Sequence, residues 1–450
     1  MNYLKFTIVI SLILFTGKKQ EAAAQMFSLN AADYSYDSSG CTDSVDFSFI
    51  DKYVKDKQIL FLGEDSHWVS EFNVVKGNLI SYLHKKFGFS IILMESKDPT
   101  TFWRTIVDTS NILNQFYGNH AIIWAWLNEE NKRLFCQARS KPDSIIIGGM
   151  DIVPLFWKRN DTNLSTANSR KYTSESQYLP ASSKARMLVL DSVARHLFEI
   201  GSNQSINGST KEERRSEYKD KEKLSQLIAD LNNLKADYIK ELSLLPPPQT
   251  IDEKLLYRIL LARPTLMRSV IELNCFGKLR DSIMAENITY FADSLFSNER
   301  IIVWAHDGHI SKSSVNHEWY PTSIGMFLPE SIKAKSYFLA VKHSEWAYNK
   351  EYIYKKSSAN HKESIENDLE KIGNKAFFLD IREAQNAGLL RKQYKYSYVH
   401  LIYQSSFHMK YKPEDQYDGI IYIKSTSMPH YSIPELKEFY NKGLSPENIR

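Results

Sequence analysis

Four consecutive polar residues, Glu64 to His67, follow an apolar run in the stretch FLGEDSHW (61–68). A neutral histidine with a carboxylate neighbour can take a proton from water near neutral pH. His67 therefore has the residue type of a general base, and Glu64 has that of the acid that orients it. Gly63, just before them, has the backbone freedom that a sharp turn after a strand needs.

Four short apolar runs of similar form end in a charged or ionisable residue or are followed directly by one. They are rich in β-branched and aromatic residues and lie at 59–63, 90–95, 144–151 and 301–306. In open parallel sheets the ligand crevice lies outside the carboxyl ends of the strands, so we expect the residues at these ends to converge. The converging set is Glu64, His67, Glu95, Asp151, His306 and His309.

Each member of this set also has a structural explanation, since a strand-end carboxylate can cap a helix and a histidine can be held in a core. Together they favour a functional site, because burying so many ionisable groups destabilises a protein unless they are paired or used. The HDGH pair follows a strand, and a tight turn at Gly308 would bring both imidazoles to one cavity.

The chemistry that this set supports is hydrolysis by an activated water, with a second histidine or a cation polarising a carbonyl. Nucleophilic catalysis is less favoured, because no Gly-x-Ser-x-Gly elbow is present and no cysteine is adjacent. A metal site is the alternative that these residues leave open, since histidine and carboxylate ligands also suit zinc, manganese or iron.

The elements between the runs predict an α/β fold. Apolar residues at helical spacing predict a helix over 72–83 that Gly88 ends, so strand, helix and strand imply a right-handed parallel crossover. Helical patterns at 185–201, 224–242 and 251–296 predict a helical subdomain, with a proline triplet at 246–248 between the last two. Later segments predict a helix in PTSIGMFLPES and strands in KSYFLAVKH, KAFFLDI and YDGIIYI.

We therefore expect a three-layer α/β/α core with a mainly parallel sheet and an inserted helical subdomain. The expected divisions are a signal peptide (1–24), a polar segment (25–45), the first part of the core (46–154), the helical subdomain (155–298) and the second part of the core with a C-terminal extension (299–450).

The N-terminus predicts export to the periplasm or the extracellular space. Lys5 precedes a mainly apolar run (6–15), and small residues follow at EAAAQ, which is the pattern of a signal peptide cleaved near Ala24. A run of this length is too short for a comfortable membrane span, so no stable anchor is expected after cleavage. The net charge of +4 over 450 residues gives no argument for a nucleic-acid partner. The oligomeric state is left open.

In order along the chain, the motifs resemble those of the erythromycin esterase family. They are Gly63-Glu64-Asp65-Ser66-His67, Leu93-Met94-Glu95-Ser96, Gly149-Met150-Asp151 and Trp304-Ala305-His306-Asp307-Gly308-His309, with RDSIMAEN (280–287) and YDGIIYI (417–423) resembling other segments.

This resemblance implies hydrolysis of a macrolide lactone or another small ester, in response to antibiotic, without a metal or other cofactor. His67 would be the general base, Glu64 and Glu95 would orient and tune it, and His306 and His309 would contact the substrate or stabilise the oxyanion. Relatives in the wider superfamily bind metal or haem, so the alternative is a metal- or haem-binding protein on the same scaffold without esterase activity.

Three departures from the family pattern concern the substrate. Trp68 stands where glycine is usual and would fill space where a macrolide enters, which also leaves open an inactive relative. Lys76 stands where arginine is frequent, keeping charge but losing bidentate geometry. Asp307-Gly308 replaces Asn-Ala and adds an acid that would pair with an imidazole and raise its pKa. Lys76, Asp151 and Trp68 are the expected substrate-binding residues.

Overall fold

The computed structural model describes part of the chain and divides it into two compact units. The described residues are 24–26, 46–97, 113, 122–137, 145–151, 180–186, 188–190, 192–193, 221–249, 253, 257, 276–313, 322–347, 362–372, 376–400 and 405–441. The first unit comprises Met1–Glu95, Thr105–Ile147 and Asn298–Arg450, and the second comprises Ser96–Arg104 and Gly148–Ser297. The predicted domain boundaries stay a prediction.

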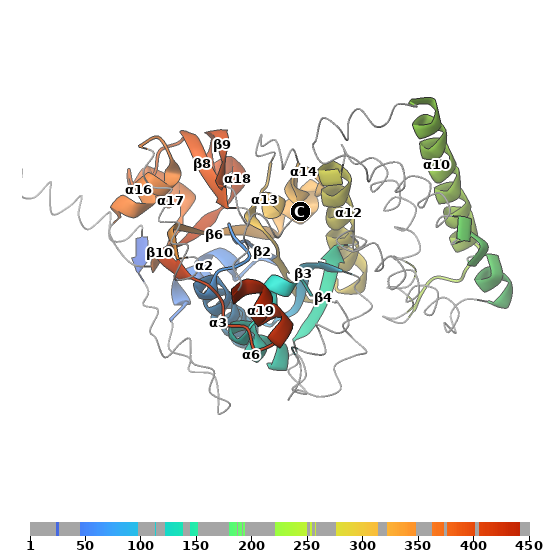
Figure 1. Cartoon of the computed structure of the whole chain (residues 1–450), viewed down its shortest axis with the longest axis horizontal. Helices are drawn as coiled ribbons and strands as arrows, with labels where there is room; N and C mark the ends of the chain where they lie inside the picture. Colours follow the sequence, from blue (N-terminus) through green and yellow to red (C-terminus); the bar gives the residue numbers. More distant parts are fainter. Residues whose placement is uncertain are drawn as a thin grey trace, which may run out of the picture. The chain divides into compact units, whose positions relative to one another are not determined.

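A mostly parallel sheet with flanking helices confirms the α/β class (Figure 1). Its strand order is β1-β7-β10-β6-β2-β5-β3-β4. The strands are β1 (Ala24–Met26), β2 (Ile59–Leu62), β3 (Phe89–Lys97), β4 (Ile146–Asp151), β5 (Arg300–Trp304), β6 (Ser336–Ala347), β7 (Ala376–Asp380) and β10 (Gly419–Ser427).

Neighbouring strands pair in parallel from β10 through β6, β2 and β5 to β3, which brings their carboxyl ends to one edge. β2 lies near the middle, and all four of its residues, Ile59–Leu62, are fully buried. Phe61 stacks on Phe338 of β6 with ring centroids 4.3 Å apart. A strand covered on both faces has no alternation of polar residues, which is why this run is continuously apolar.

Helix α3 (Ser70–Phe87) follows the polar stretch after β2 and packs its apolar face inward. Phe72, Leu79 and Leu83 are fully buried, at the helical spacing that the sequence showed. The helix ends at Gly88, whose φ of 72° is left-handed and whose N–H donates to the carbonyl oxygen of His84. Glycine adopts this conformation without a steric penalty, so it ends the helix cleanly.

The structure differs from the sequence expectation after β5. Instead of a tight turn at Gly308, a one-turn helix, α13 (Asp307–Ile310), begins directly after His306. The imidazole of His306 accepts a hydrogen bond from the Gly308 backbone N–H and so caps this turn. His306 and His309 are thereby held at the two ends of one helical turn.

Two strand arrangements were not predicted. β7 pairs antiparallel with β10 and with the short β1. A hairpin of β8 (Tyr394–His400) and β9 (Ser405–Tyr411) forms a separate two-stranded sheet, which lies beside α16 (Ile365–Lys371) in Figure 1.

The remaining elements of the first unit are short. They are η2 (Ser48–Ile50), α2 (Asp51–Val54), η3 (Trp124–Trp126), α6 (Glu129–Gln137), α14 (Ile324–Phe327), α15 (Glu330–Ala334), α17 (Ile381–Asn386), α18 (Pro413–Gln416) and α19 (Pro434–Asn441).

The second unit contains α10 (Lys221–Ser243), α12 (Phe276–Tyr290) and the π-helical turn η5 (Phe291–Leu295). Of the helix expected at 185–201, residues 185–186, 188–190 and 192–193 are helical, and the other positions lie outside the described residues. Of the helix expected at 251–296, most positions in 251–275 also lie outside the described residues. Across the part of the chain that the structure describes, no helix has the length and apolar character to cross a membrane.

Candidate active site

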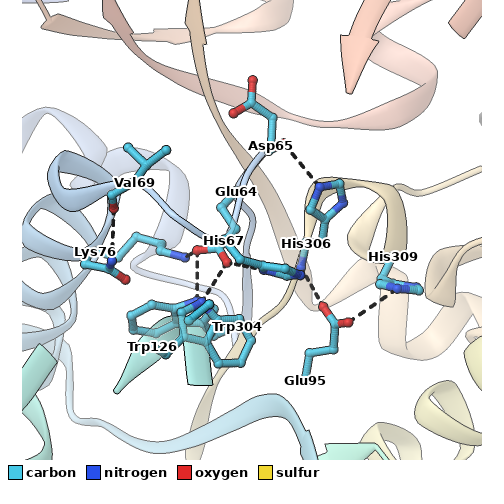
Figure 2. Close-up of polar contacts among 12 residues, drawn as sticks. Glu64, Asp65, His67, Val69, Lys76, Glu95, Trp126, Trp304, His306 and His309 are labelled. Carbon is cyan, nitrogen blue, oxygen red and sulfur yellow. Dashed lines mark hydrogen bonds and ion pairs between the residues drawn. The ribbon is translucent and has the colours of Figure 1, made fainter. Parts of the chain in front are cut away.

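The Glu64 carboxylate, at the carboxyl end of β2, lies at the centre of a buried polar cluster in the first unit (Figure 2). Its Oε1 accepts from Nε1 of Trp126 at 2.7 Å and lies 2.6 Å from Nδ1 of His67. Its Oε2 accepts from Nζ of Lys76 and from Nε1 of Trp304, the latter at 3.2 Å. Four donors thus converge on one carboxylate.

These donors keep Glu64 ionised. Burial raises the pKa of Glu64, but the charge of Lys76 and the hydrogen bond from His67 outweigh it, so the pKa lies below its ordinary value. Lys76 is fully buried and its Nζ also lies 3.8 Å above the ring of Trp304. Burial lowers the pKa of Lys76 to about 8 against the opposing effect of Glu64, so the lysine still carries its charge at neutral pH.

The Glu64 contact fixes the tautomer of His67. An ionised carboxylate only accepts hydrogen bonds, so the imidazole nitrogen that faces it, Nδ1, carries the proton. Nε2 is then the nitrogen with a lone pair. The His67 side chain is 16% exposed, whereas that of Glu64 is 1% exposed. The cluster therefore reaches solvent through the residue that can take a proton.

Glu95, two residues before the end of β3, holds the segment that carries the other two histidines. Its Oε2 accepts from the backbone N–H of His306 at 2.9 Å, and its Oε1 lies 3.4 Å from Nε2 of His309. All three residues are buried. One carboxylate thus connects both imidazole-bearing positions of the HDGH motif to β3.

His306 is neutral and lies beside His67. Its Nδ1 accepts from Gly308 N, so its Nε2 carries the proton, 3.2 Å from the carbonyl oxygen of Asp65. Burial, together with the nearby His67, lowers the pKa of His306 to about 3. The rings of His67 and His306 lie 5.2 Å apart between centroids. This contact joins the Glu64–His67 pair to the Glu95 group.

The expected substrate-binding residues have three different environments. Lys76 contacts Glu64 inside the core. Trp68 is 8% exposed, and its ring meets that of His67 edge-on at 5.5 Å between centroids. Asp151 belongs to the second unit, where its Oδ2 accepts from Nη2 of Arg280 at 2.6 Å.

Asp307 does not make the pairing that the sequence suggested. Its carboxyl lies against Gly63, so close that a Cβ at Gly63 would be 1.9 Å from Oδ1, and Nζ of Lys342 is 4.0 Å from Oδ2. Burial raises the pKa of Asp307 well above its ordinary value. The imidazole of His306 instead contacts backbone groups, and its pKa is lowered rather than raised.

Trp126 is the residue that sequence reasoning missed. It lies in the segment IIWAWLNEEN (122–131), which ends no predicted strand, so the rule of strand ends did not select it. Trp304 begins the motif at 304–309, and the sequence predicts no separate role for it. Lys76 carried a detectable signal, because it falls four residues after Phe72 and four before Ile80, on the apolar face of α3.

Histidines and carboxylates are also metal ligands, so a metal site is the alternative prediction from the sequence. Within the described ranges, no group of three or more His, Cys, Asp or Glu side chains has the arrangement of a metal site. Glu64 accepts four hydrogen bonds and His306 uses both ring nitrogens, so these two residues already have their partners.

The site thus combines an α/β sheet with a histidine and carboxylate pair at the carboxyl ends of its parallel strands. The family model described as erythromycin esterase matches residues 85–426. The chain therefore belongs to the erythromycin esterase family, which confirms the resemblance. Glu95, His306 and His309 lie within the matched range, and Glu64, His67 and Lys76 precede it.

A relative and three solved structures extend this comparison. The protein named "Putative hydrolase YbfO" of Bacillus subtilis (strain 168) is 23% identical over 409 residues, covering 84% of this chain and 86% of that protein. Together with the family, this relative supports hydrolase function.

The solved structures are below 25% identity and show the fold. A Bacillus cereus protein has a TM-score of 0.66 at 15% identity, covering 92% of this chain and 98% of that one. A succinoglycan biosynthesis protein has a TM-score of 0.60 at 18% identity, with coverage of 93% and 99%. A mutant of the erythromycin esterase EreC in its open conformation has a TM-score of 0.57 at 16% identity, with coverage of 86% and 95%.

Proposed function

We propose that this chain hydrolyses an ester or a macrolide lactone with a water molecule activated by His67. The observation that carries the proposal is the Glu64–His67 contact of 2.6 Å. It leaves Nε2 of a partly exposed imidazole as the proton acceptor, as a general base for water requires.

In the proposed step, the water oxygen forms a bond to the carbonyl carbon while its proton passes to Nε2 of His67. The imidazolium that forms is stabilised by the ionised Glu64. The C–O bond to the alkoxide then breaks, and the alkoxide takes the proton from His67. The products are a carboxylic acid and an alcohol, which remain one molecule when the substrate is a lactone.

The surroundings of His67 supply the proposed substrate contacts. The rings of Trp68 and His306 both lie within 5.5 Å of the His67 ring, measured between centroids. Glu95 fixes the segment that bears His306 and His309. The two histidines would then contact the carbonyl group or the leaving oxygen, and Trp68 would limit the size of the ester.

The test is to incubate the protein with a panel of macrolides, simple lactones and aryl esters, with and without a chelator, and to detect addition of water by mass spectrometry. Hydrolysis that persists with the chelator and disappears in His67→Asn is the expected result. His430→Asn is the matched control, because His430 also contacts a carboxylate, Glu130 at 2.8 Å, but its side chain is 74% exposed. Unchanged hydrolysis in His67→Asn would overturn the assignment.

The cellular role is a separate part of the proposal. We propose export on the basis of the charged and apolar leader before Ala24, and a role in the response to antibiotic on the basis of the family. N-terminal sequencing of the protein from the exported fraction should begin near Gln25. Expression in a susceptible host should raise the macrolide concentration that the host tolerates, and active lactone hydrolysis without such protection would assign the chain to another ester.

A further inference from the structure

We propose that Trp126 is a positioning residue for His67: its indole N–H fixes the Glu64 carboxylate, which in turn holds the proton on Nδ1 of the imidazole. This inference rests on the proposed function, because it explains how His67 is kept ready as a base. It concerns a residue outside the strand ends and outside every motif that carries the family resemblance.

Two donors meet at Oε1 of Glu64. Trp126 and His67 approach this one oxygen at 2.7 Å and 2.6 Å. A carboxylate oxygen has two lone pairs, so these two donors fill its accepting capacity. The Trp126 N–H therefore determines which direction remains for Nδ1 of His67.

Trp126 is itself held by a buried amide network. Nδ2 of Asn131 donates to the carbonyl oxygen of Trp126 at 3.1 Å and to Oδ1 of Asn73 at 2.9 Å. Nδ2 of Asn73 donates to the carbonyl oxygen of Val69 at 2.9 Å. Both asparagines are fully buried. Trp126 is thus tied to Val69, the residue that precedes α3 and lies two residues after His67.

The Trp126 ring packs against the rings of His67 and Trp304. The Trp126 ring meets the His67 ring edge-on, with centroids 5.4 Å apart and planes at 90°. Trp126 also packs on Trp304 at 5.6 Å between centroids. Trp304 donates to the other oxygen of Glu64 at the longer distance of 3.2 Å and covers Lys76. Trp126 consequently contacts both members of the Glu64–His67 pair.

A tryptophan that only filled space would tolerate loss of its N–H. Removing this donor from the ionised Glu64 frees the carboxylate to rotate and weakens its hold on Nδ1, so a larger share of His67 carries the proton on Nε2. That tautomer cannot act as a base toward water at Nε2. The predicted defect is in the chemical step rather than in substrate binding.

The experiment compares Trp126→Phe with a protein carrying 3-benzothienylalanine at position 126, which keeps the bicyclic shape without the N–H. In both we expect kcat on the hydrolysed ester to fall about tenfold to hundredfold with KM little changed, the usual range for loss of an orienting partner. Nitrogen-15 NMR of histidine-labelled protein, with the His67 signals assigned by their loss in His67→Asn, should show less protonated Nδ1.

Tyr431→Phe is the control, because it removes a hydrogen bond of 3.0 Å to the carbonyl oxygen of Ala125, the neighbour of Trp126, without touching Glu64. It should keep wild-type kcat and the wild-type His67 tautomer. If both replacements at position 126 keep them as well, the inference is wrong while His67 stands as the base. If the wild-type protein hydrolyses no ester, the proposed function fails, and the NMR comparison still decides whether Trp126 sets the tautomer.

Discussion

Nδ1 of His67 lies 2.6 Å from Oε1 of Glu64, and both residues follow directly on the fully buried strand β2. The acid is buried and ionised, and the base is partly exposed. The carboxylate charge is thereby kept away from water. In the protein interior, where the dielectric constant is lower, it acts more strongly on the imidazole.

Replacing Glu64 by glutamine should leave Lys76 buried without its carboxylate. Since breaking a buried ion pair exposes the remaining charge to an apolar interior, we expect a loss of about 3 kcal/mol in the free energy of unfolding. Urea unfolding measures it. The control is Glu383→Gln, which removes an exposed pair with Lys52 at 2.7 Å and should cost about 0.5 kcal/mol. Equal losses in the two variants would show that Glu64 and Lys76 are not coupled.

The stability contributed by Lys76 should depend on alkaline pH. Its pKa is about 8 in the folded protein against 10.5 ordinarily, so between these values the unfolded chain binds more protons and the free energy of unfolding rises with pH. The gain over this window is roughly 3 kcal/mol. In Lys76→Met the gain should be absent. Parallel pH profiles for the wild-type protein and the variant, from urea unfolding, would contradict this account.

Asp307 should destabilise the folded protein as pH rises. Its folded pKa lies well above the ordinary 3.8, so above that value the folded state holds a proton that the unfolded state has lost. Asp307→Asn removes this cost, so its stability relative to the wild-type protein should increase from about pH 4 to neutral pH. Melting temperatures at both pH values measure the difference. A constant difference would show that Asp307 is ionised in the folded state.

Gly63 should tolerate no side chain. A Cβ there would lie 1.9 Å from Oδ1 of Asp307 and 2.7 Å from Cδ1 of Ile310, so Gly63→Ala should cost about 3 kcal/mol by overpacking. The matched control is Gly77→Ala inside α3, where, apart from the adjoining residues and the helix's own backbone, no atom of the described residues lies within 4 Å of the added Cβ and alanine should stabilise by about 1 kcal/mol. Thermal unfolding of both variants would decide, and similar effects in the two would refute the close approach at Gly63.

The strand ends were readable from the sequence because buried parallel strands are continuous apolar runs followed by polar residues. This pattern selected six residues, and the structure places five of them, Glu64, His67, Glu95, His306 and His309, in the first unit and Asp151 in the second. The antiparallel β7 could not be read in this way, since a short apolar strand looks the same in either direction.

The roles of Lys76 and Trp126 depended on tertiary contacts. The sequence predicts Lys76 as a substrate contact, and the structure buries it on the apolar face of α3 against Glu64. Trp126 lies between two strands that the sequence predicted, and only the packing of α3 against α6, through Asn73 and Asn131, brings its indole to Glu64.

The central claim is that Glu64 and His67 act as one unit that activates water, and a double-mutant cycle on kcat tests it most directly. Glu64→Gln should lower kcat roughly a hundredfold and His67→Asn at least as much, the range typical of a general base. Because Glu64 acts through His67, the double variant should be no slower than His67→Asn alone. A double variant slower than His67→Asn by the full Glu64→Gln factor, or a His67→Asn variant with wild-type kcat, would contradict the claim.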